Sequence, residues 1–235
     1  VASRKPQGIE PGKYDVIFDF LPYANVLNTV GAASSIFSVE TGLSFLAGQM
    51  GKAVGSSSIT FTDDATLKNG FYSTNCDAEG VPTQKNTIID KGMLRTYLHN
   101  TSTAKRYKTK TTANAGLTSP SAFNLSLEAG NLNKDEMITS IKRGIYITNV
   151  WYTRFQNYAT GDFSTIPRDG AFLIENGKIR HPVKDIRVSD NVLNILRSTE
   201  ALTKERRQIF GWEVDVPTIT PMALVRKVNI TKSEK

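Results

Sequence analysis

The sequence predicts an α+β fold that is strand-rich, with mixed or antiparallel sheets and a few packed helices. Two hairpin signals support this prediction. Asn176-Gly177 separates the apolar run 171–175 from 178–180, and Asn-Gly suits the positive φ values of a type I′ turn. Asp90-Lys91-Gly92 separates two further apolar runs within 86–99. Strand segments outnumber helical ones, and the hairpins indicate antiparallel or mixed pairing.

The chain is expected to form one domain between two polar ends. Residues 1–13 contain several Pro and Gly residues and are predicted to be a linker from an N-terminal domain that this chain lacks. Residues 14–231 are predicted to be the folded domain. The tail, 232–235, is expected to be frayed.

The first elements predicted are a strand at 14–20 and a helix at 22–35, with Pro22 in the first helical turn. A second helix is predicted at 39–50, because apolar residues recur there at helical spacing. Those residues are Val39, Leu43, Leu46 and Met50. Further strands are expected at 59–61, from 71–72 onward, and at 123–127, 145–152, 208–214 and 222–230.

Polar residues indicate where three short helices begin. Thr101 or Ser102 should cap a helix at 101–107, and an irregular surface loop, 108–121, should follow it. Ser189 or Asp190 should cap a helix that runs to about 199. Asn133 and Glu136 form a variant capping box for the remaining helix, which Gly144 is expected to end at the C′ position.

The composition is that of an ordinary globular protein, with 235 residues, of which 39% are hydrophobic and 22% charged. No apolar run is long enough to cross a bilayer, so no membrane partner is expected. Cys76 is the only cysteine, which excludes an internal disulfide and favours a cytoplasmic location.

The formal net charge is +7, and the basic residues occur in short groups. Short groups are typical of solvated protein surfaces, so nucleic acid is not the expected partner. A basic module that binds nucleic acid or an acidic protein is the alternative function. The groups are Lys105-Arg106-Lys108-Lys110, Lys142-Arg143 and Lys204-Arg206-Arg207.

Few residues are available for nucleophilic or zinc chemistry. His99 and His181 are the only imidazoles, and neither lies in a motif with Ser or Cys. Cys76 lies beside Asp77 and Glu79, whose negative charge would raise the pKa of the thiol. A semi-buried, structural cysteine is therefore favoured at Cys76.

The carboxylates leave two weaker possibilities. Asp63, Asp64, Asp77 and Glu79 are the residues that a hard-cation site would use, but the calcium-loop pattern is missing and roles in turns or caps are favoured. An independent hydrolase built on paired carboxylates stays open as a third function, because the distance between carboxylates depends on the fold.

An acidic turn, residues 76–83, precedes the first hairpin. Gly80 is expected to supply a positive φ, and Pro82 fixes φ and favours an extended residue before it. Asp77 and Glu79 are expected to accept backbone N–H bonds and so to shape a tight loop at the head of the hairpin.

Five stretches resemble, in this order, the TldD/PmbA family, and within it the PmbA branch, also called TldE. The resemblance covers residues 12–230 as a C-terminal domain. The stretches are DAEGVPT (77–83), IDKGML (89–94), TANAG (112–116), TGDFS (160–164) and AFLIENGKI (171–179). Residues in them that are expected to be structural or to contact peptide or partner are Asp77, Glu79, Gly80, Pro82, Asn114, Gly116, Gly161, Asn176 and Gly177.

The resemblance also implies that two kinds of subunit have different roles. TldD-type members carry zinc on a His-Glu-x-x-x-His helix with a late Cys and act as peptidases, whereas PmbA-type members lack these ligands and pair with the TldD type. The zinc helix would fall at 22–35, which has no His or Glu here, and 209–221 has no Cys.

The resemblance therefore implies a non-catalytic subunit of a cytoplasmic TldD/TldE-type zinc metallopeptidase complex that acts on peptides or unfolded segments. It implies no catalytic residue, cofactor or metal in this chain. The zinc would belong to a TldD-type partner in a heterodimer.

Overall fold

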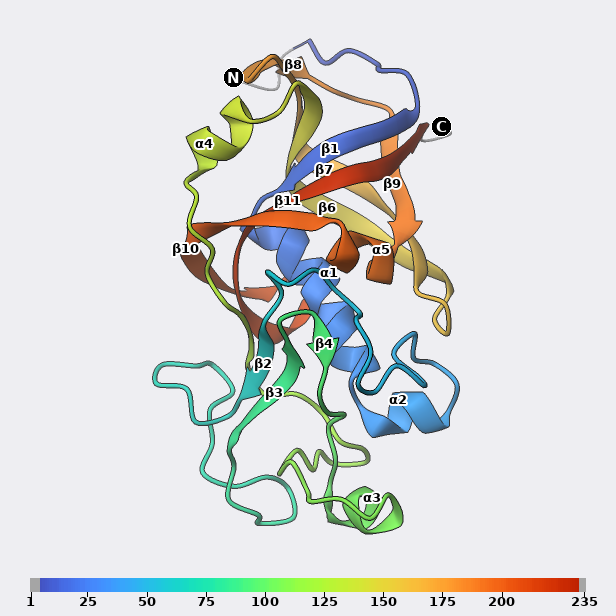
Figure 1. Ribbon diagram of the computed structural model, residues 1–235, viewed down its shortest axis with the longest axis vertical. Coiled ribbons are helices and arrows are strands. Elements are labelled where there is room, and N and C mark those ends of the chain that lie inside the picture. Colours follow the sequence, from blue (N-terminus) through green and yellow to red (C-terminus); the bar gives the residue numbers. More distant parts are fainter. Residues whose placement is uncertain (1–4, 233–235) are drawn as a thin grey trace.

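The structure is a computed structural model that describes residues 5–232, and it confirms the α+β class (Figure 1). Within these residues one mixed 11-stranded sheet is joined by five helices. The strands are β1 (Gly12–Phe18), β2 (Phe61–Asp64), β3 (Lys85–Asp90), β4 (Met93–Leu94), β5 (Leu125–Leu127), β6 (Arg143–Asn157), β7 (Asp162–Glu175), β8 (Lys178–Pro182), β9 (Ile186–Asn191), β10 (Thr199–Gly211) and β11 (Val214–Lys232). The helices are α1 (Phe20–Ala33), α2 (Ile36–Glu40), α3 (Thr101–Arg106), α4 (Lys134–Thr139) and α5 (Val192–Arg197).

Part of the sheet closes into a ring. β1 pairs in parallel with β6 and antiparallel with β11, and β7 and β9 complete the circuit between them. Residues of this ring that face inward, such as Val16, Ile145 and Val225, are fully buried. A closed ring satisfies the edges of these strands, which leaves few unpaired backbone groups for solvent.

Helix α1 crosses the middle of the molecule (Figure 1). Asp19 caps it by accepting a hydrogen bond from the N–H of Phe20. Its apolar side chains are almost all inaccessible to solvent, and Tyr23, Leu27 and Val30 belong to the main core. Only Leu21, Thr29 and Ala32 of this helix are partly or fully exposed, so α1 presents a narrow open side.

The two predicted hairpins are confirmed. β3 and β4 pair antiparallel, with positive φ at Lys91 and Gly92 in the turn. β7 and β8 pair antiparallel around Asn176 and Gly177, whose φ values are 49° and 72°. Both φ values are positive, as a type I′ turn requires.

The predicted helix at 39–50 is wrong. Helix α2 ends at Glu40, and a series of turns follows it. Leu43 and Met50 are exposed rather than buried on a helical face. Gly42 and Gly48 both adopt positive φ, which a right-handed helix does not allow. The chain therefore forms turns here, although its apolar residues have helical spacing.

Other local predictions also need correction. Phe71 and Tyr72 lie in an exposed turn region instead of a strand. The capping box of Asn133 and Glu136 is confirmed, but α4 ends at Thr139 and Gly144 lies inside β6. A Cβ on Gly144 would lie 2.3 Å from the carbonyl oxygen of Asp15, so close strand pairing explains this glycine.

The predicted caps of two helices are each displaced along the chain. Asn100, not Thr101 or Ser102, caps α3, and Asn191, not Ser189 or Asp190, caps α5. The cap of α3 lies one residue before the predicted position, and the cap of α5 lies one residue after it. In both helices the side chain of an asparagine accepts the N–H bonds. The loop at 108–121 is irregular as predicted, but Thr112 to Ala115 are buried rather than on the surface.

The ends of the domain are defined by β1 and β11. β1 begins at Gly12, and Gln7 forms an isolated bridge to Val183. β11 runs to Lys232, whereas the rest of the predicted tail, 233–235, lies outside the described residues, as do residues 1–4 of the predicted linker. Among the described residues, no helix is long and apolar enough to cross a membrane.

Candidate functional site

Helix α1 and the turn between β10 and β11 are joined by two buried asparagines. Asn25 and Asn28 lie one helical turn apart on α1, and 5% and 9% of their surfaces are exposed. Both side chains bond to the start of β11 or to the turn before it. We call this set of contacts, between Asn25 or Asn28 and residues 213–218, the amide clamp.

Asn28 uses its whole hydrogen-bonding capacity in the amide clamp. Its Nδ2 donates to the carbonyl oxygen of Val216 at 2.7 Å and to Oγ1 of Thr218 at 2.9 Å. Its Oδ1 accepts from the N–H groups of Asp215 at 3.0 Å and Val216 at 3.1 Å. A primary amide has two donors and two acceptor sites, so Asn28 has none left for another ligand.

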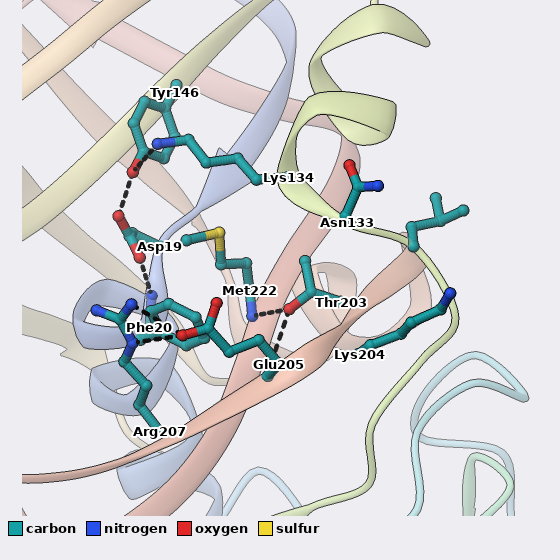
Figure 2. Close-up of a pocket in the computed structure, with 11 residues that line it drawn as sticks. Asp19, Phe20, Asn133, Lys134, Tyr146, Thr203, Lys204, Glu205, Arg207 and Met222 are labelled. Atoms are coloured by element: carbon teal, nitrogen blue, oxygen red, sulfur yellow. Dashed lines mark hydrogen bonds and ion pairs between the residues drawn. The ribbon is translucent and has the colours of Figure 1, made fainter.

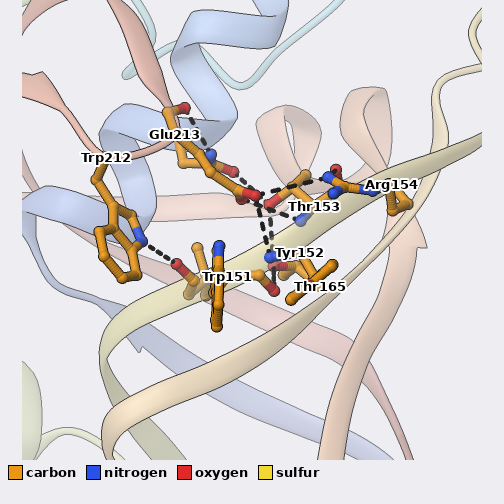
Figure 3. Close-up of polar contacts among 9 residues, drawn as sticks. Trp151, Tyr152, Thr153, Arg154, Thr165, Trp212 and Glu213 are labelled. Atoms are coloured by element: carbon orange, nitrogen blue, oxygen red, sulfur yellow. Dashed lines mark hydrogen bonds and ion pairs between the residues drawn. The ribbon is translucent and has the colours of Figure 1, made fainter.

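Asn25 connects the clamp to β6. Its Nδ2 donates to the carbonyl oxygen of Glu213 at 2.9 Å, and its Oδ1 accepts from Oγ1 of Thr153 at 2.8 Å. The carboxylate of Glu213 accepts from the N–H groups of Tyr152 and Thr153, as Figure 3 shows. Three segments distant in sequence are thus held at one point.

The backbone around the clamp adopts unusual conformations. Tyr152 and Trp212 have φ values of 57° and 59°, although residues with large side chains rarely adopt positive φ. Trp212 is held by a 2.9 Å hydrogen bond from its Nε1 to the carbonyl oxygen of Val150 (Figure 3). Backbone strain of this kind persists only where surrounding contacts fix it, and it concentrates at functional sites.

The acidic turn forms a second cluster, in the lower part of Figure 1 beside β3. Asp77 is buried, and its carboxylate accepts from the N–H groups of Glu79, Val81 and Ala115, each at 3.0 Å. Glu79 accepts from the N–H of Thr101 at 2.8 Å. Asp77 thus accepts N–H bonds that shape the loop, as predicted, whereas the carboxylate of Glu79 bonds to the start of α3 instead of to the turn.

Asp63 and Asn114 organise the neighbouring polar core. Asp63 is fully buried, and its carboxylate accepts from Nδ2 of Asn114 at 2.6 Å and from the N–H groups of Phe123 and Asn124. Burial raises the pKa of Asp63 to about 6, while these hydrogen bonds lower it. Asn114 also accepts from Asn86, which links the TANAG stretch to β3.

The predicted glycines and Pro82 lie in three separate places. Gly80 has the expected positive φ, and Pro82 pairs with Cys76 at the base of the acidic turn. Gly116 packs against Ser119 in the same region, whereas Gly161 lies against Phe45, beside α1. Asn176 and Gly177 form the turn between β7 and β8. The predicted site residues therefore form no single site.

The histidines and the cysteine are not part of the clamp. His99 is buried, contacts Thr103, and has a pKa below its usual range because burial disfavours its charged form. His181 contacts the backbone of Pro182. Cys76 is exposed, so the prediction of a semi-buried cysteine is wrong.

A polar cavity of about 390 Å³ lies near the N-terminus of α1 (Figure 2). Lys134 donates to the hydroxyl of Tyr146, which donates to Asp19, and Arg207 pairs with Glu205. The pKa of Tyr146 is raised by burial and by Asp19. The lining carries three basic side chains, Lys134, Lys204 and Arg207, against the carboxylates of Asp19 and Glu205, so it has a small excess of positive charge.

The fold and the clamp can now be compared with known proteins. The family model of the PmbA/TldA metallopeptidase C-terminal domain matches residues 11–232. The chain therefore belongs to the PmbA/TldD family, through its C-terminal domain.

Curated relatives agree with this assignment. A metalloprotease of Methanocaldococcus jannaschii is 34% identical over 211 residues, which are 86% of this chain and 46% of the relative. A Haemophilus influenzae metalloprotease, a PmbA homologue, is 27% identical over 205 residues, 87% of this chain and 44% of that protein. The chain spans about half the length of the curated relatives it matches.

Solved structures share the fold. A Thermotoga maritima protein described as a proposed modulator of a DNA gyrase has a TM-score of 0.89 and 29% identity, covering 98% of this chain and 52% of that one. TldE from Thermococcus kodakarensis has a TM-score of 0.85 with the same coverage, but its 24% identity supports the fold alone.

The residues at the amide clamp do not fit a zinc ion. Zinc in proteins is held by Cys, His and carboxylate groups. Helix α1 contains none of these, and the Glu213 carboxylate already accepts two backbone N–H bonds. Across residues 5–232 no group of three or more His, Cys, Asp or Glu side chains is placed to hold a metal ion.

Sequence reasoning missed the amide clamp. The resemblance located the two segments, 22–35 and 209–221, but the residues of this chain gave no direct sign of the hydrogen bonds that join them. The available signal was a pair of amides, Asn25 and Asn28, three residues apart in an otherwise apolar helix. Buried polar groups need partners, so this pair indicated a contact with another segment.

Proposed function

We propose that this chain is the non-catalytic, TldE/PmbA-like part of a cytoplasmic zinc metallopeptidase complex that cleaves peptides or unfolded segments. A TldD-type subunit would supply zinc and the general base, and this chain would form part of the wall of the peptide chamber. The family assignment supports the class of complex. The division of roles rests on the amide clamp.

The amide clamp is the observation that carries the proposal. It lies where α1 meets residues 213–218, the two regions in which the family resemblance places zinc ligands. In this chain side-chain amides join the two segments directly, and Asn28 has no free hydrogen-bonding position. Hydrogen bonds alone can therefore join α1 to residues 213–218, without a metal ion.

Co-expression with a TldD-type subunit tests the proposal. We expect the two proteins to elute together in gel filtration and to cleave a fluorogenic peptide, while this chain alone cleaves none. Replacing Glu by Gln in the partner's His-Glu-x-x-x-His helix should abolish cleavage without dissociating the complex.

Two results would contradict the proposal. Full activity of the partner alone, with no complex formed, would show that this chain is not a subunit of the peptidase. Cleavage by this chain alone, resistant to a zinc chelator, would instead favour the independent hydrolase.

A further inference from the structure

An apolar pocket of about 220 Å³ lies on the open side of α1. Thr29, Ala32 and Ala33 form its helical wall. The opposite wall comes from the loop after α2 and from the end of the β6–β7 hairpin. Its other lining residues are Ser38, Leu43, Phe45, Phe155 and Tyr158. We call this cavity the α1 pocket.

Small side chains and a glycine create the α1 pocket. Thr29 and Ala32 are the positions at which α1 is open to solvent after its first turn, and neither fills the space beside it. Gly161 has a φ of 82° and lies against Phe45, where an added Cβ would be only 3.1 Å from the ring. This close approach allows the β6–β7 turn to pack near Phe45.

Aromatic rings give the pocket a defined shape. Phe155 and Tyr158 stack with ring centroids 4.8 Å apart, and Phe155 also contacts the buried Phe163 at 6.1 Å. Ring pairs in this geometry are favourable beyond the area that they bury. The wall formed by Phe155 is therefore supported from behind.

The lining selects the chemistry of a ligand. None of the lining residues carries a charge, so a charged group would lose its hydration without gaining a partner. An apolar cavity of roughly 150 Å³ is large enough to bind benzene. The α1 pocket is larger, and it accommodates one side chain of the size of Leu, Met or Phe.

The α1 pocket is continuous with the amide clamp. Thr153 of β6 bonds to Asn25, and Phe155 points to the same side of the strand two residues later. Along α1, Thr29 follows Asn25 by about one turn. The two features therefore share α1 and β6 and lie next to each other.

We propose that the α1 pocket receives one apolar side chain of the peptide substrate and so contributes to the sequence preference of the complex. This proposal rests on the function proposed above. Occupation of the pocket would bury the outer edges of Leu43 and Tyr158, which are 54% exposed without a ligand. Thr29, Ala32 and Phe155 would be specificity-determining residues.

The test uses an Ala32→Phe variant in the complex with the zinc-bearing subunit. Ala32 is exposed on a helix, so the larger ring fills the pocket without disturbing the core. Two fluorogenic peptides that differ only by Leu or Gly at one position are compared. We scan that position along the peptide for the largest Leu preference of the unmodified complex.

We expect the variant to reduce the Leu-to-Gly ratio of kcat/KM about 10-fold or more, the range for burying one Leu side chain. Cleavage of the Gly peptide should change little. Ser102→Phe, which adds the same ring at an exposed position of α3, is the matched control and should leave the ratio unchanged.

Other outcomes overturn the proposal in distinguishable ways. If Ala32→Phe dissociates the complex, the pocket seats the partner chain. If the complex is intact and the ratio is unchanged, no substrate side chain enters the pocket. If the unmodified complex shows no cleavage, the proposed function fails first; equal binding of the Leu and Gly peptides, measured by fluorescence anisotropy, would then reject the pocket separately.

Discussion

Two buried polar clusters in this molecule use side chains to satisfy backbone groups, but they differ in charge and in their relation to the family. The cluster at the acidic turn is built on the carboxylates of Asp63 and Asp77. The amide clamp is built on the neutral side chains of Asn25 and Asn28. The first contains stretches that resemble the family, and the second joins the two segments, 22–35 and 209–221, in which the resemblance places the zinc ligands of TldD-type members.

The two clusters differ in what they contribute: the acidic-turn cluster supports the fold, and the amide clamp lies at the position that bears on the proposed function. The acidic turn and the TANAG stretch hold the lower loops in place through the hydrogen bonds of Asp77 and Asn114. Under the proposed function, the clamp joins with amides the two segments in which the resemblance places the zinc ligands of TldD-type members. The matching stretches then reflect the shared fold, and the clamp reflects the proposed non-catalytic role.

The largest expected effect comes from breaking the clamp. Asn28→Leu leaves the N–H groups of Asp215 and Val216 without their acceptor, and each lost partner costs about 1–3 kcal/mol. We expect a loss of at least about 3 kcal/mol in the free energy of unfolding, measured by urea denaturation. Thr29→Ala, which removes only a bond to Val26, is the control and should lose far less. A small loss for Asn28→Leu would mean that the clamp does not join the two segments.

Breaking the acidic turn should have the next largest effect. Asp77→Ala removes the acceptor of three N–H groups, and we expect a loss of about 2–3 kcal/mol in the same measurement. The lower loops should become more susceptible to limited proteolysis while the strand ring stays resistant. Equal protection of the loops in both proteins would contradict the scaffold role.

The charge of Asp63 makes the first cluster sensitive to pH. Its folded pKa of about 6 exceeds the ordinary value of 3.8, so the folded state binds the proton more tightly. The associated stability is fully present below about pH 4 and is lost as pH rises through 6, by up to about 3 kcal/mol.

An Asp63→Asn variant separates this contribution from other groups. It should show a flatter dependence of unfolding free energy on pH between 4 and 6, because the neutral amide does not titrate. An unchanged pH profile would place the folded pKa of Asp63 at its ordinary value.

The smallest effect is expected at Glu79. Its bond to the N–H of Thr101 is exposed, so Glu79→Ala should change the free energy of unfolding by about 0.5 kcal/mol. Comparing the losses of unfolding free energy in Asp77→Ala and Glu79→Ala separates the buried contact of Asp77 from the exposed contact of Glu79. A larger loss at Glu79 than at Asp77 would reverse that order.

Local chemistry explains which parts of the fold were predictable. Asn176-Gly177 and the Asn133 capping box depend on neighbouring residues alone, and both were predicted correctly. The 39–50 helix failed because its apolar spacing outweighed Gly42 and Gly48 in the prediction. The bulk of β10 was missed, since its exposed segment near Lys204 has no alternating pattern.

The candidate site was less predictable than the fold. Asp77 and Glu79 have local partners or partners on the next loop, so their role as N–H acceptors followed from sequence. The clamp joins residues 25–28 to residues 213–218, and no local rule specifies a contact across that separation. Only the closed ring of strands brings α1 and the β10–β11 turn together.

The zinc content of the purified chain tests the central claim most directly. After incubation with zinc and extensive dialysis, we expect substoichiometric metal in this chain and stoichiometric zinc in its complex with a TldD-type subunit. The metal should remain with the partner when the two are separated. One tightly held zinc per isolated chain, released by Asn28→Leu, would show that the amide clamp is a metal site and would contradict the account.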